Sequence, residues 1–291
     1  MQIDAKGLTY IYNPKSPFAS TALSGVDLSI AEGEFFGIIG HTGSGKSTFV
    51  QHLNALLKAS GGSLRIGEYD LTDKKCKFLE LRSKVGMVFQ YPEYQLFAET
   101  VEKDVAFGIK NFSKEKTEDE IREAVKEALE TVGLDWNAVK DASPFELSGG
   151  QKRRVAIAGV IVTKPEILIL DEPAAGLDPL GKKELMELLH SIHGGWCKTI
   201  IIVSHDMDEI AENCTRAAVF SGGRVVMEGK PSEIFLRADA LLEMGLDIPV
   251  TAKCARILKQ DGFSLDTDFT CDDFVAKVLS LCGKGGAEHA Q

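Results

Sequence analysis

Short alternating runs of hydrophobic and polar residues characterise the beginning of the chain. One run extends from Leu8 to Tyr12 and another from Leu23 to Ile30, with Asn13-Pro14 between them and Glu32-Gly33 after them. Alternation with a period of two is typical of strands that bury one face. We therefore expect a small antiparallel sheet at the amino terminus.

Continuous apolar runs follow at wider intervals. They comprise residues 35–39, 85–89, 167–170, 199–203 and 217–220. A helix is predicted between the third and fourth runs, because Asp178 is a favourable N-cap, Pro179 suits the first helical position, and Leu185, Leu189 and Ile192 recur on one face. Strand, helix and strand at this spacing predict a parallel sheet with right-handed crossovers.

Helical patterns cover most of the chain from Thr100 to Ile161. The clearest one begins at Thr117, which can form a capping box with Glu120, and ends at Gly133. This block separates two parts of the predicted sheet. We therefore expect an inserted helical subdomain at about residues 92–162.

The carboxyl-terminal part has a weaker pattern. We expect a core domain over residues 1–237 and an extension over residues 238–291, which begins irregularly and becomes helical around Phe274 and Leu279. The residues after Gly283 are small and polar, so we expect a disordered tail.

Composition and charge narrow the possible functions. The chain has 291 residues, 44% of them hydrophobic, which is enough for a substantial core, and its net charge of −10 argues against non-specific binding to nucleic acid or to an anionic membrane surface. The six cysteines form no C-x-x-C pair, so neither a zinc site nor a disulfide framework is predicted. Met1 to Asp4 do not begin a signal peptide, and no apolar run approaches the roughly 18 residues of a membrane-spanning helix.

A glycine-rich segment between a predicted strand and a predicted helix fills the template G-x-x-x-x-G-K-[S/T]. Its residues are Gly40, His41, Thr42, Gly43, Ser44, Gly45, Lys46, Ser47 and Thr48. In this context the backbone N–H groups and the helix dipole can hold phosphates, Lys46 can reach the β- and γ-phosphates of ATP, and the Ser47 hydroxyl can bind Mg²⁺. The alternative is a loop that only turns the chain. The helix after it is expected to run to about Leu57.

Two acids end the apolar run at residues 167–170. In P-loop proteins the first acid holds the magnesium shell, which assigns that role to Asp171. Glu172 is then placed to orient and deprotonate the water that attacks the γ-phosphate. The alternative for Glu172 is a solvated side chain at the end of a strand.

A second glycine motif opens a later helix. It consists of Leu147, Ser148, Gly149, Gly150 and Gln151, with Ser148 as a favourable N-cap. One nucleotide cannot easily touch both this helix start and the one at Gly40 in the same chain. Here the sequence resembles the ATP-binding cassette (ABC) ATPases over about residues 3–235. In that family this signature closes over the γ-phosphate held by a partner subunit.

The resemblance implies an α/β fold and further site residues. The fold is a P-loop NTPase core with a parallel sheet, an amino-terminal antiparallel β subdomain, an inserted helical subdomain and a small carboxyl-terminal extension. Gln90 corresponds to the Q-loop ligand of magnesium and water, Asp178 to the D-loop residue that crosses the dimer, and His205 to the switch histidine at the γ-phosphate. Tyr12 stands where the family places an aromatic ring under adenine. For Tyr12, a half-buried strand position is an equal alternative.

A finer resemblance lies in three shorter segments. Residues 89–97 and 244–249 look like the ATPase subunits of energy-coupling factor (ECF) transporters, which import vitamins and transition-metal ions, and the loop at residues 13–21 resembles the second of their two ATPase types. This likeness implies a second ABC ATPase subunit, identical or different, a transmembrane coupling subunit and a substrate-binding membrane subunit. It also implies a peripheral location on the cytoplasmic face of the cell membrane.

Other functions remain as alternatives. The chain could serve another ABC importer, or it could be a soluble ABC ATPase that acts on nucleic acid or the ribosome. The second class usually has two cassettes in one chain or a long coiled-coil insertion, and the acidic charge also disfavours it, so nucleic acid is not an expected partner. A P-loop kinase or GTPase is disfavoured, because the motif at Ser148 would have no role in such an enzyme.

The segment that follows Gln90 is predicted to be a loop with large side chains. Tyr91, Tyr94 and Phe97 suit a groove that receives a helix from a membrane subunit. The alternative is that these rings pack inside the helical subdomain.

Overall fold

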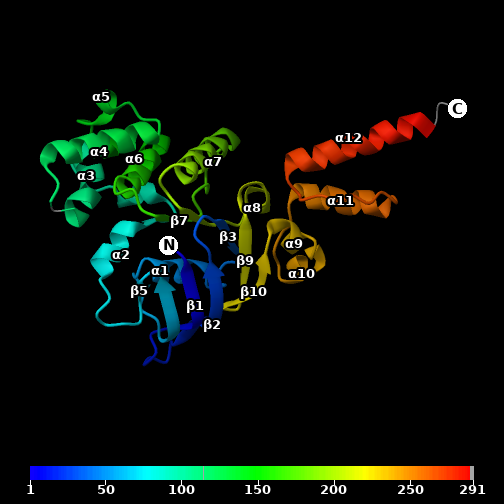
Figure 1. Ribbon diagram of the computed structural model, residues 1–291, viewed down its shortest axis with the longest axis horizontal. Helices are drawn as coiled ribbons and strands as arrows, with labels where there is room; N and C mark the ends of the chain where they lie inside the picture. Colours follow the sequence, from blue (N-terminus) through cyan, green and yellow to red (C-terminus); the bar gives the residue numbers. More distant parts are fainter. Residues whose placement is uncertain (114, 289–291) are drawn as a thin grey trace.

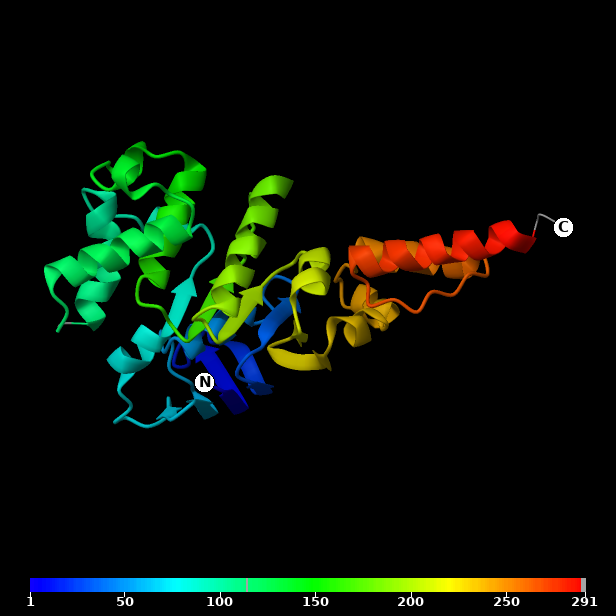
Figure 2. The same cartoon turned by 45° about the horizontal axis from the view of Figure 1, so that its top comes forward.

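Among the residues that the structure describes, 1–113 and 115–288, the computed structural model contains two β-sheets with helices around them (Figure 1). For residues 282–288 the description is limited to the backbone. The helices α3 to α6 lie at one end of the molecule and α11 and α12 at the other, as Figures 1 and 2 both show.

The smaller sheet is antiparallel and contains the amino terminus. Its strands are β1 (Ile3–Tyr12), β2 (Ser20–Ile30), β4 (Gly61–Ile66) and β5 (Tyr69–Asp70), in the order β2-β1-β4-β5. The antiparallel sheet expected from the alternating pattern is confirmed.

The larger sheet contains the continuous apolar runs. Its strands are β3 (Phe35–Gly40), β6 (Val85–Val88), β7 (Ile167–Asp171), β8 (Thr199–Val203), β9 (Arg216–Ser221) and β10 (Arg224–Gly229), in the order β10-β9-β3-β8-β7-β6. All neighbouring pairs from β9 to β6 are parallel, whereas β10 is antiparallel to β9. The parallel sheet is confirmed, and β10 is an addition that the sequence pattern did not predict.

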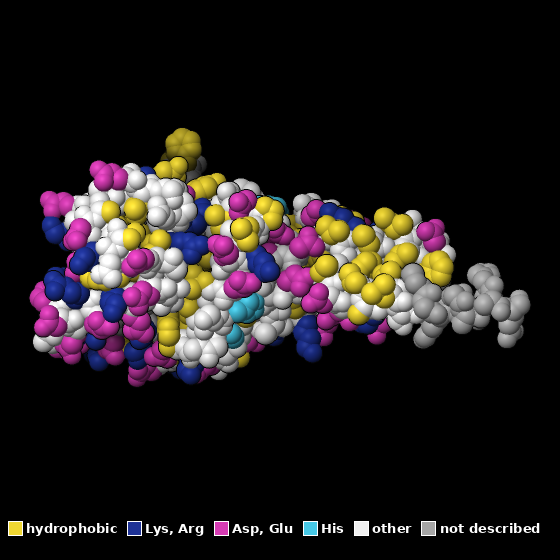
Figure 3. Space-filling model, turned by 90° about the horizontal axis from the view of Figure 1, so that it is seen from above, with side chains coloured by type: hydrophobic (Ala, Val, Ile, Leu, Met, Phe, Trp, Pro, Cys, Tyr) yellow, Lys and Arg dark blue, Asp and Glu magenta, His cyan; other side chains and the backbone are white. Residues whose placement is uncertain are grey.

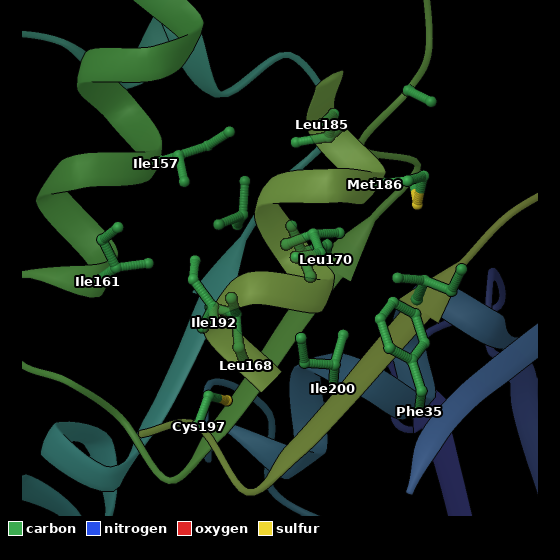
Figure 4. Close-up of a cluster of buried hydrophobic side chains, with 14 of the residues drawn as sticks. Phe35, Ile157, Ile161, Leu168, Leu170, Leu185, Met186, Ile192, Cys197 and Ile200 are labelled. Carbon is green, nitrogen blue, oxygen red and sulfur yellow. The ribbon is translucent and has the colours of Figure 1, made fainter. Parts of the chain in front are cut away.

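The parallel strands are largely apolar because both faces of their sheet are covered. Successive residues point to opposite sides. Leu168, Leu170 and Ile200 face the helices α6 (Gly149–Ile161) and α7 (Pro179–Gly194), as Figure 4 shows. Ile169 and Ile201 face the antiparallel sheet and α1 (Lys46–Leu53). The parallel sheet therefore lies between two apolar layers.

Helices surround these sheets, and α4, α6 and α7 begin directly after the predicted caps Thr117, Ser148 and Asp178. In addition to α1, α6 and α7 they are α2 (Phe78–Lys84), η1 (Pro92–Gln95), α3 (Val101–Phe112), α4 (Glu118–Thr131), α5 (Trp136–Val139), η2 (Pro144–Glu146) and α8 (Met207–Asn213). Thr117 and Glu120 form the expected capping box of α4. Helix α1 ends at Leu53, before the predicted end near Leu57, because Ala55 adopts a positive φ of 54°.

The carboxyl-terminal part is more helical than its sequence pattern indicated. Beyond α9 (Pro231–Phe235) it forms α10 (Ala238–Glu243), α11 (Val250–Gln260) and α12 (Cys271–Glu288). The region after residue 238, expected to begin irregularly, is ordered because Leu241, Leu246 and Ile248 join the buried cluster of the sheet. Hydrophobic side chains also gather on the surface of this end (Figure 3), among them Ile257, Val275 and Leu279.

The expected disordered tail falls partly on described residues. The helical backbone of α12 continues past Gly283 to Glu288, and residues 289–291 lie outside the described part of the chain. Within the residues described, no helix combines the length and the apolar character needed to cross a membrane.

Candidate active site

The predicted site residues meet at one edge of the parallel sheet. Gly40 ends β3, Gln90 follows β6, Asp171 ends β7, and His205 follows β8. The carboxyl ends of parallel strands share one edge, and ligands of such sheets bind there. The structure thus brings together residues that lie far apart in the sequence.

The glycine loop has a conformation that depends on glycine. Gly40 has a φ of +153° and Gly45 a φ of +105°. A Cβ atom on Gly40 would lie 2.4 Å from the Phe220 carbonyl oxygen, and one on Gly45 would lie 2.6 Å from the Ala22 carbonyl oxygen. Both distances are too short for any side chain, so the loop approaches its neighbours closely only because these positions are glycine.

Lys46 begins α1 and is buried. Its ammonium donates hydrogen bonds to the carbonyl oxygens of Gly40, at 2.7 Å, and His41, at 3.0 Å. Burial lowers the pKa of Lys46, whereas the carboxylates of Glu172 and Asp171 act in the opposite direction. The ammonium therefore lies inside its own loop, where phosphate oxygens can replace the carbonyl partners.

Asp171 and Ser47 form a pair of hard oxygen donors. Asp171 is buried, which raises its pKa, while a hydrogen bond with the Ser47 hydroxyl lowers it and the charge of Glu172 raises it further. Ser47 itself is exposed. A hydroxyl beside a carboxylate is a donor set that suits Mg²⁺, so the residues present fit this ion.

Glu172 is held in an unusual backbone conformation. Its φ is +50°, and its N–H group donates to the Val203 carbonyl oxygen at 2.8 Å. Its carboxylate accepts a hydrogen bond from Gln90 Nε2 at 2.8 Å and lies 3.6 Å from Nδ1 of the exposed His205. A left-handed conformation costs free energy for a residue other than glycine, and such strain is concentrated at functional sites.

Gln90, Glu172 and His205 line a cavity of about 330 Å³. Further polar residues, which the sequence did not predict, line this cavity as well. Lys182 Nζ donates to Asp206 Oδ2 at 2.8 Å, and the Ser204 hydroxyl donates to Glu209. Burial raises the pKa of Glu209. Lys182 comes one helical turn after Asp178, but no local pattern identifies its partner Asp206, the N-cap of α8, so the sequence held no signal for this pair.

Tyr12 lies beside the first turn of α1. Its hydroxyl is 3.2 Å from Thr48 Oγ1, and its ring packs edge-on against Tyr10 with the centroids 4.8 Å apart. The side chain is 37% exposed. The ring thus contacts a strand neighbour and also keeps an accessible surface near the glycine loop.

The second glycine motif opens α6, away from α1 (Figure 1). Ser148 caps this helix and forms a capping box with Gln151, while Gly149 and Gly150 are exposed and Leu147 is half-buried. Asp178 is also exposed and caps α7 by accepting a bond from the Gly181 N–H at 2.7 Å. Within this chain, therefore, the motif does not reach the glycine loop at Gly40.

The aromatic segment, residues 91–97, lies on the surface. Tyr91, Tyr94 and Phe97 are 44%, 84% and 59% exposed. Phe97 packs edge-on against Phe107, which is itself 52% exposed. The interpretation in which these rings pack inside the helical subdomain is therefore wrong. Leu96, which is buried, anchors the segment instead.

Comparisons with known proteins agree with this geometry. A family model described as ABC transporter matches residues 23–175. The chain is 48% identical to the energy-coupling factor transporter ATP-binding protein EcfA2 of Clostridium tetani, over 97% of each chain. It is 50% identical to the protein of the same name from Clostridioides difficile, over 98% of this chain and 99% of that protein.

Solved structures give the same picture. The protein cbiO1 from Clostridium perfringens, described as part of the ABC transporter complex cbiONQ, superposes with a TM-score of 0.72 at 37% identity, covering 90% of this chain and 98% of that one. The ATP-binding cassette MJ0796, solved as a dimer bound to ADP and Pi, superposes with a TM-score of 0.70 at 30% identity, covering 79% of this chain and 98% of that one.

Proposed function

We propose a function for this chain from the premise that it belongs to the ABC transporter family. It is the ATP-binding and ATP-hydrolysing subunit that energises an ECF-type importer for vitamins or transition-metal ions. The convergence of Lys46, Asp171, Glu172, Gln90 and His205 at one sheet edge carries the ATPase assignment. The ECF assignment is supported by relatives of that name that match nearly the whole chain.

ATP binds at the glycine loop. The N–H groups of the loop and the first turn of α1 surround the phosphates, and Lys46 exchanges the carbonyls of Gly40 and His41 for phosphate oxygens. Tyr12 provides the accessible aromatic surface on which adenine stacks. Ser47, Gln90 and, through a water molecule, Asp171 would hold Mg²⁺, which neutralises phosphate charge when bound.

Hydrolysis depends on Glu172 as the general base. Its carboxylate accepts the proton of the attacking water, and the bond from Gln90 leaves its second oxygen available for this task. His205 Nδ1 lies 3.6 Å from the same oxygen, Oε2, that accepts the bond from Gln90, and the His205 side chain contacts the γ-phosphate. Because both neighbours hold the Glu172 side chain, positioning accounts for much of its effect.

A second ATPase subunit completes the site. The motif from Leu147 to Gln151 and the D-loop residue Asp178 are largely exposed, and the helix α6 that this motif opens lies away from α1 (Figure 1). The exposed backbone of Gly149 and Gly150 and the exposed carboxylate of Asp178 are therefore accessible to a nucleotide held by a partner. The dimeric state of a solved cassette supports the same arrangement for this chain.

The aromatic segment connects the site to the membrane. It follows Gln90 directly, so a movement of this glutamine on ATP binding reaches Tyr91 and Tyr94 first. These exposed rings form a surface that suits helices of a transmembrane coupling subunit. A substrate-binding membrane subunit completes the importer, and the chain is peripheral, on the cytoplasmic face of the membrane.

Affinity purification from detergent-solubilised membranes, followed by mass spectrometry of the retained proteins, tests this proposal. We expect ATPase activity together with an ABC ATPase partner and multi-spanning membrane proteins. Retention of ribosomal proteins or nucleic acid, without membrane proteins, would contradict the transport assignment but not the ATPase assignment.

A further inference from the structure

A buried arginine lies next to the second glycine motif. Arg153 is on α6 and is 7% exposed. Its Nη1 donates to the Ala175 carbonyl oxygen at 2.9 Å and the Pro173 carbonyl oxygen at 3.4 Å, and its Nε lies 3.4 Å from Glu93 Oε2. Burying a charge is costly unless it is paired and hydrogen-bonded, so these partners determine where the guanidinium lies.

The partners of Arg153 belong to two functional parts of the molecule, the turn of Glu172 and the aromatic segment. Glu93 is in η1, within the aromatic segment. Pro173 and Ala175 belong to the turn that begins at Glu172, since the Ala175 N–H donates to the Glu172 carbonyl oxygen at 3.2 Å. Arg153 therefore joins the aromatic segment, the turn of Glu172 and the helix of the second glycine motif.

The planar guanidinium makes the hydrogen bonds to the three partners depend on one another. Arginine presents its donors in a rigid fork, so a shift of one partner rotates the group and alters its bonds to the others. Glu93 is itself largely buried, with a side chain that is 20% exposed, so water competes little for the bond. A displacement of η1 would thus change the hydrogen bonds to the carbonyl groups of Pro173 and Ala175.

The neighbouring arginine has a different set of partners. Arg154 donates to the Val132 carbonyl oxygen at 2.7 Å and to Glu184 Oε2 at 2.6 Å. Its side chain is 37% exposed, and its bonds join α6 to the end of α4 and to α7. It has the same chemistry on the same helix but does not bond to η1 or to the Glu172 turn, which makes it a matched control.

We propose that Arg153 is a positioning residue that couples the aromatic segment to the turn of Glu172. Docking of a partner at the segment then changes the arrangement of the turn, and nucleotide binding beside the turn changes the arrangement of the segment. The inference rests on the proposed function, because it treats the segment as the docking surface and Glu172 as the base. By reciprocity, nucleotide at the glycine loop should also change the segment.

Hydrogen–deuterium exchange of the full chain, with and without Mg²⁺ and a non-hydrolysable ATP analogue, tests the coupling. In the wild type we expect the analogue to protect the glycine loop and to change exchange in residues 91–98. Arg153→Met and Glu93→Ala should keep the protection of the loop but lose the change in residues 91–98. Arg154→Met should keep both effects.

The outcomes separate coupling from general loosening of the fold. If Arg153→Met or Glu93→Ala still shows the wild-type change in exchange at residues 91–98, the inference is overturned. An equal loss of this change in Arg154→Met overturns it as well. Should Arg153→Met not fold, Glu93→Ala decides the question, since it removes the carboxylate that accepts the bond from Arg153. Absence of loop protection in the wild type would instead refute nucleotide binding, and the inference would fall with the proposed function.

Discussion

Glu172 shows how much of the site depends on single residues. Its backbone is strained at a φ of +50°, its N–H bonds to β8, and its Oε2 atom lies close to both Gln90 and His205. Lys46, by contrast, has exchanged water for two carbonyl oxygens of its own loop. The Glu172 side chain is thus held in place by its neighbours, which reduces the reorganisation needed when substrate binds, whereas Lys46 must exchange its carbonyl partners for phosphate oxygens.

Replacing Lys46 with alanine should remove productive ATP binding. The γ-phosphate would lose a charge-assisted hydrogen bond worth about 1.5–3 kcal/mol, which weakens ATP affinity by at least about tenfold. Equilibrium binding of a fluorescent ATP analogue, with ATP as competitor, measures the change. Lys58→Ala, at an exposed position after α1, is the control. Unchanged hydrolysis in Lys46→Ala would refute the assignment of the loop.

The substitution Glu172→Gln should separate binding from hydrolysis. The amide oxygen can still accept the bond from Gln90, but it cannot take the proton of water. We expect ATP affinity close to that of the wild type and a hydrolysis rate lower by about 10²–10⁴-fold, the usual range for general-base catalysis. A phosphate-release assay measures the rate. Wild-type turnover in this variant would show that another group is the base.

Tyr12→Ala distinguishes adenine stacking from strand packing. Loss of the stacked ring should weaken ATP by about 1–3 kcal/mol, by analogy with base–aromatic stacking, and leave the affinity for inorganic triphosphate unchanged. Tyr12→Phe keeps the ring and removes the contact with Thr48, so it is the control. Equal ATP affinity in Tyr12→Ala would favour the strand-packing interpretation.

At the scale of elements, local caps and apolar faces determine where helices begin and how they pack. Thr117, Ser148 and Asp178 each accept a hydrogen bond from a backbone N–H in the first turn that follows them. Ser148 and Asp178 are also exposed, so the same residues that start α6 and α7 present polar groups to a partner. The same polar side chains can therefore cap the helices and contact a partner.

Helix α7 provides a test of the packing. Leu189 is fully buried against the parallel sheet, whereas Leu180, near the start of the same helix, is 64% exposed. We expect Leu189→Ala to reduce the free energy of unfolding by about 2–5 kcal/mol, because it removes apolar contacts and leaves a cavity. Leu180→Ala should change the free energy by less than about 0.5 kcal/mol. Urea unfolding followed by circular dichroism measures both, and equal effects would contradict the packing described.

At the scale of the whole molecule, the exposed surfaces indicate a subunit that works in an assembly. The aromatic segment, the helix starts of α6 and α7, and the hydrophobic side chains over α11 and α12 (Figure 3) are all accessible in the single chain. Large exposed apolar groups commonly mark protein contacts.

Tyr94→Asp tests the docking surface. Tyr94 is 84% exposed, so a charge there should leave the fold and ATP binding intact, but it should abolish assembly with the membrane subunit and substrate uptake, because the charge would be buried in the contact. Co-purification and uptake into proteoliposomes measure the effect. Phe18→Asp, at an 83% exposed position between β1 and β2, should assemble normally. Normal assembly of Tyr94→Asp would refute this surface.

The sequence by itself determined the features that a few neighbouring residues encode. The strands at residues 35–40 and 167–171 follow from apolar runs, the start of α4 from Thr117 and Glu120, and the phosphate loop from the spacing of Gly40, Gly45 and Lys46. These features depend on short-range sterics and hydrogen bonds, so a local pattern suffices to predict them. The helices α10 and α11 were not predicted, because their formation depends on the burial of their apolar side chains against the sheet.

The tertiary structure alone decided which of these residues act together. Gln90 bonds to Glu172 across 82 positions of sequence, and Arg153 meets Glu93 across 60. Neither pair has a local signature, since the strand order β3-β8-β7-β6 and the docking of α6 bring the partners together. Such contacts form only when the whole chain has closed its long loops and buried its core, which is why the pairing of site residues is a property of the fold and not of any segment.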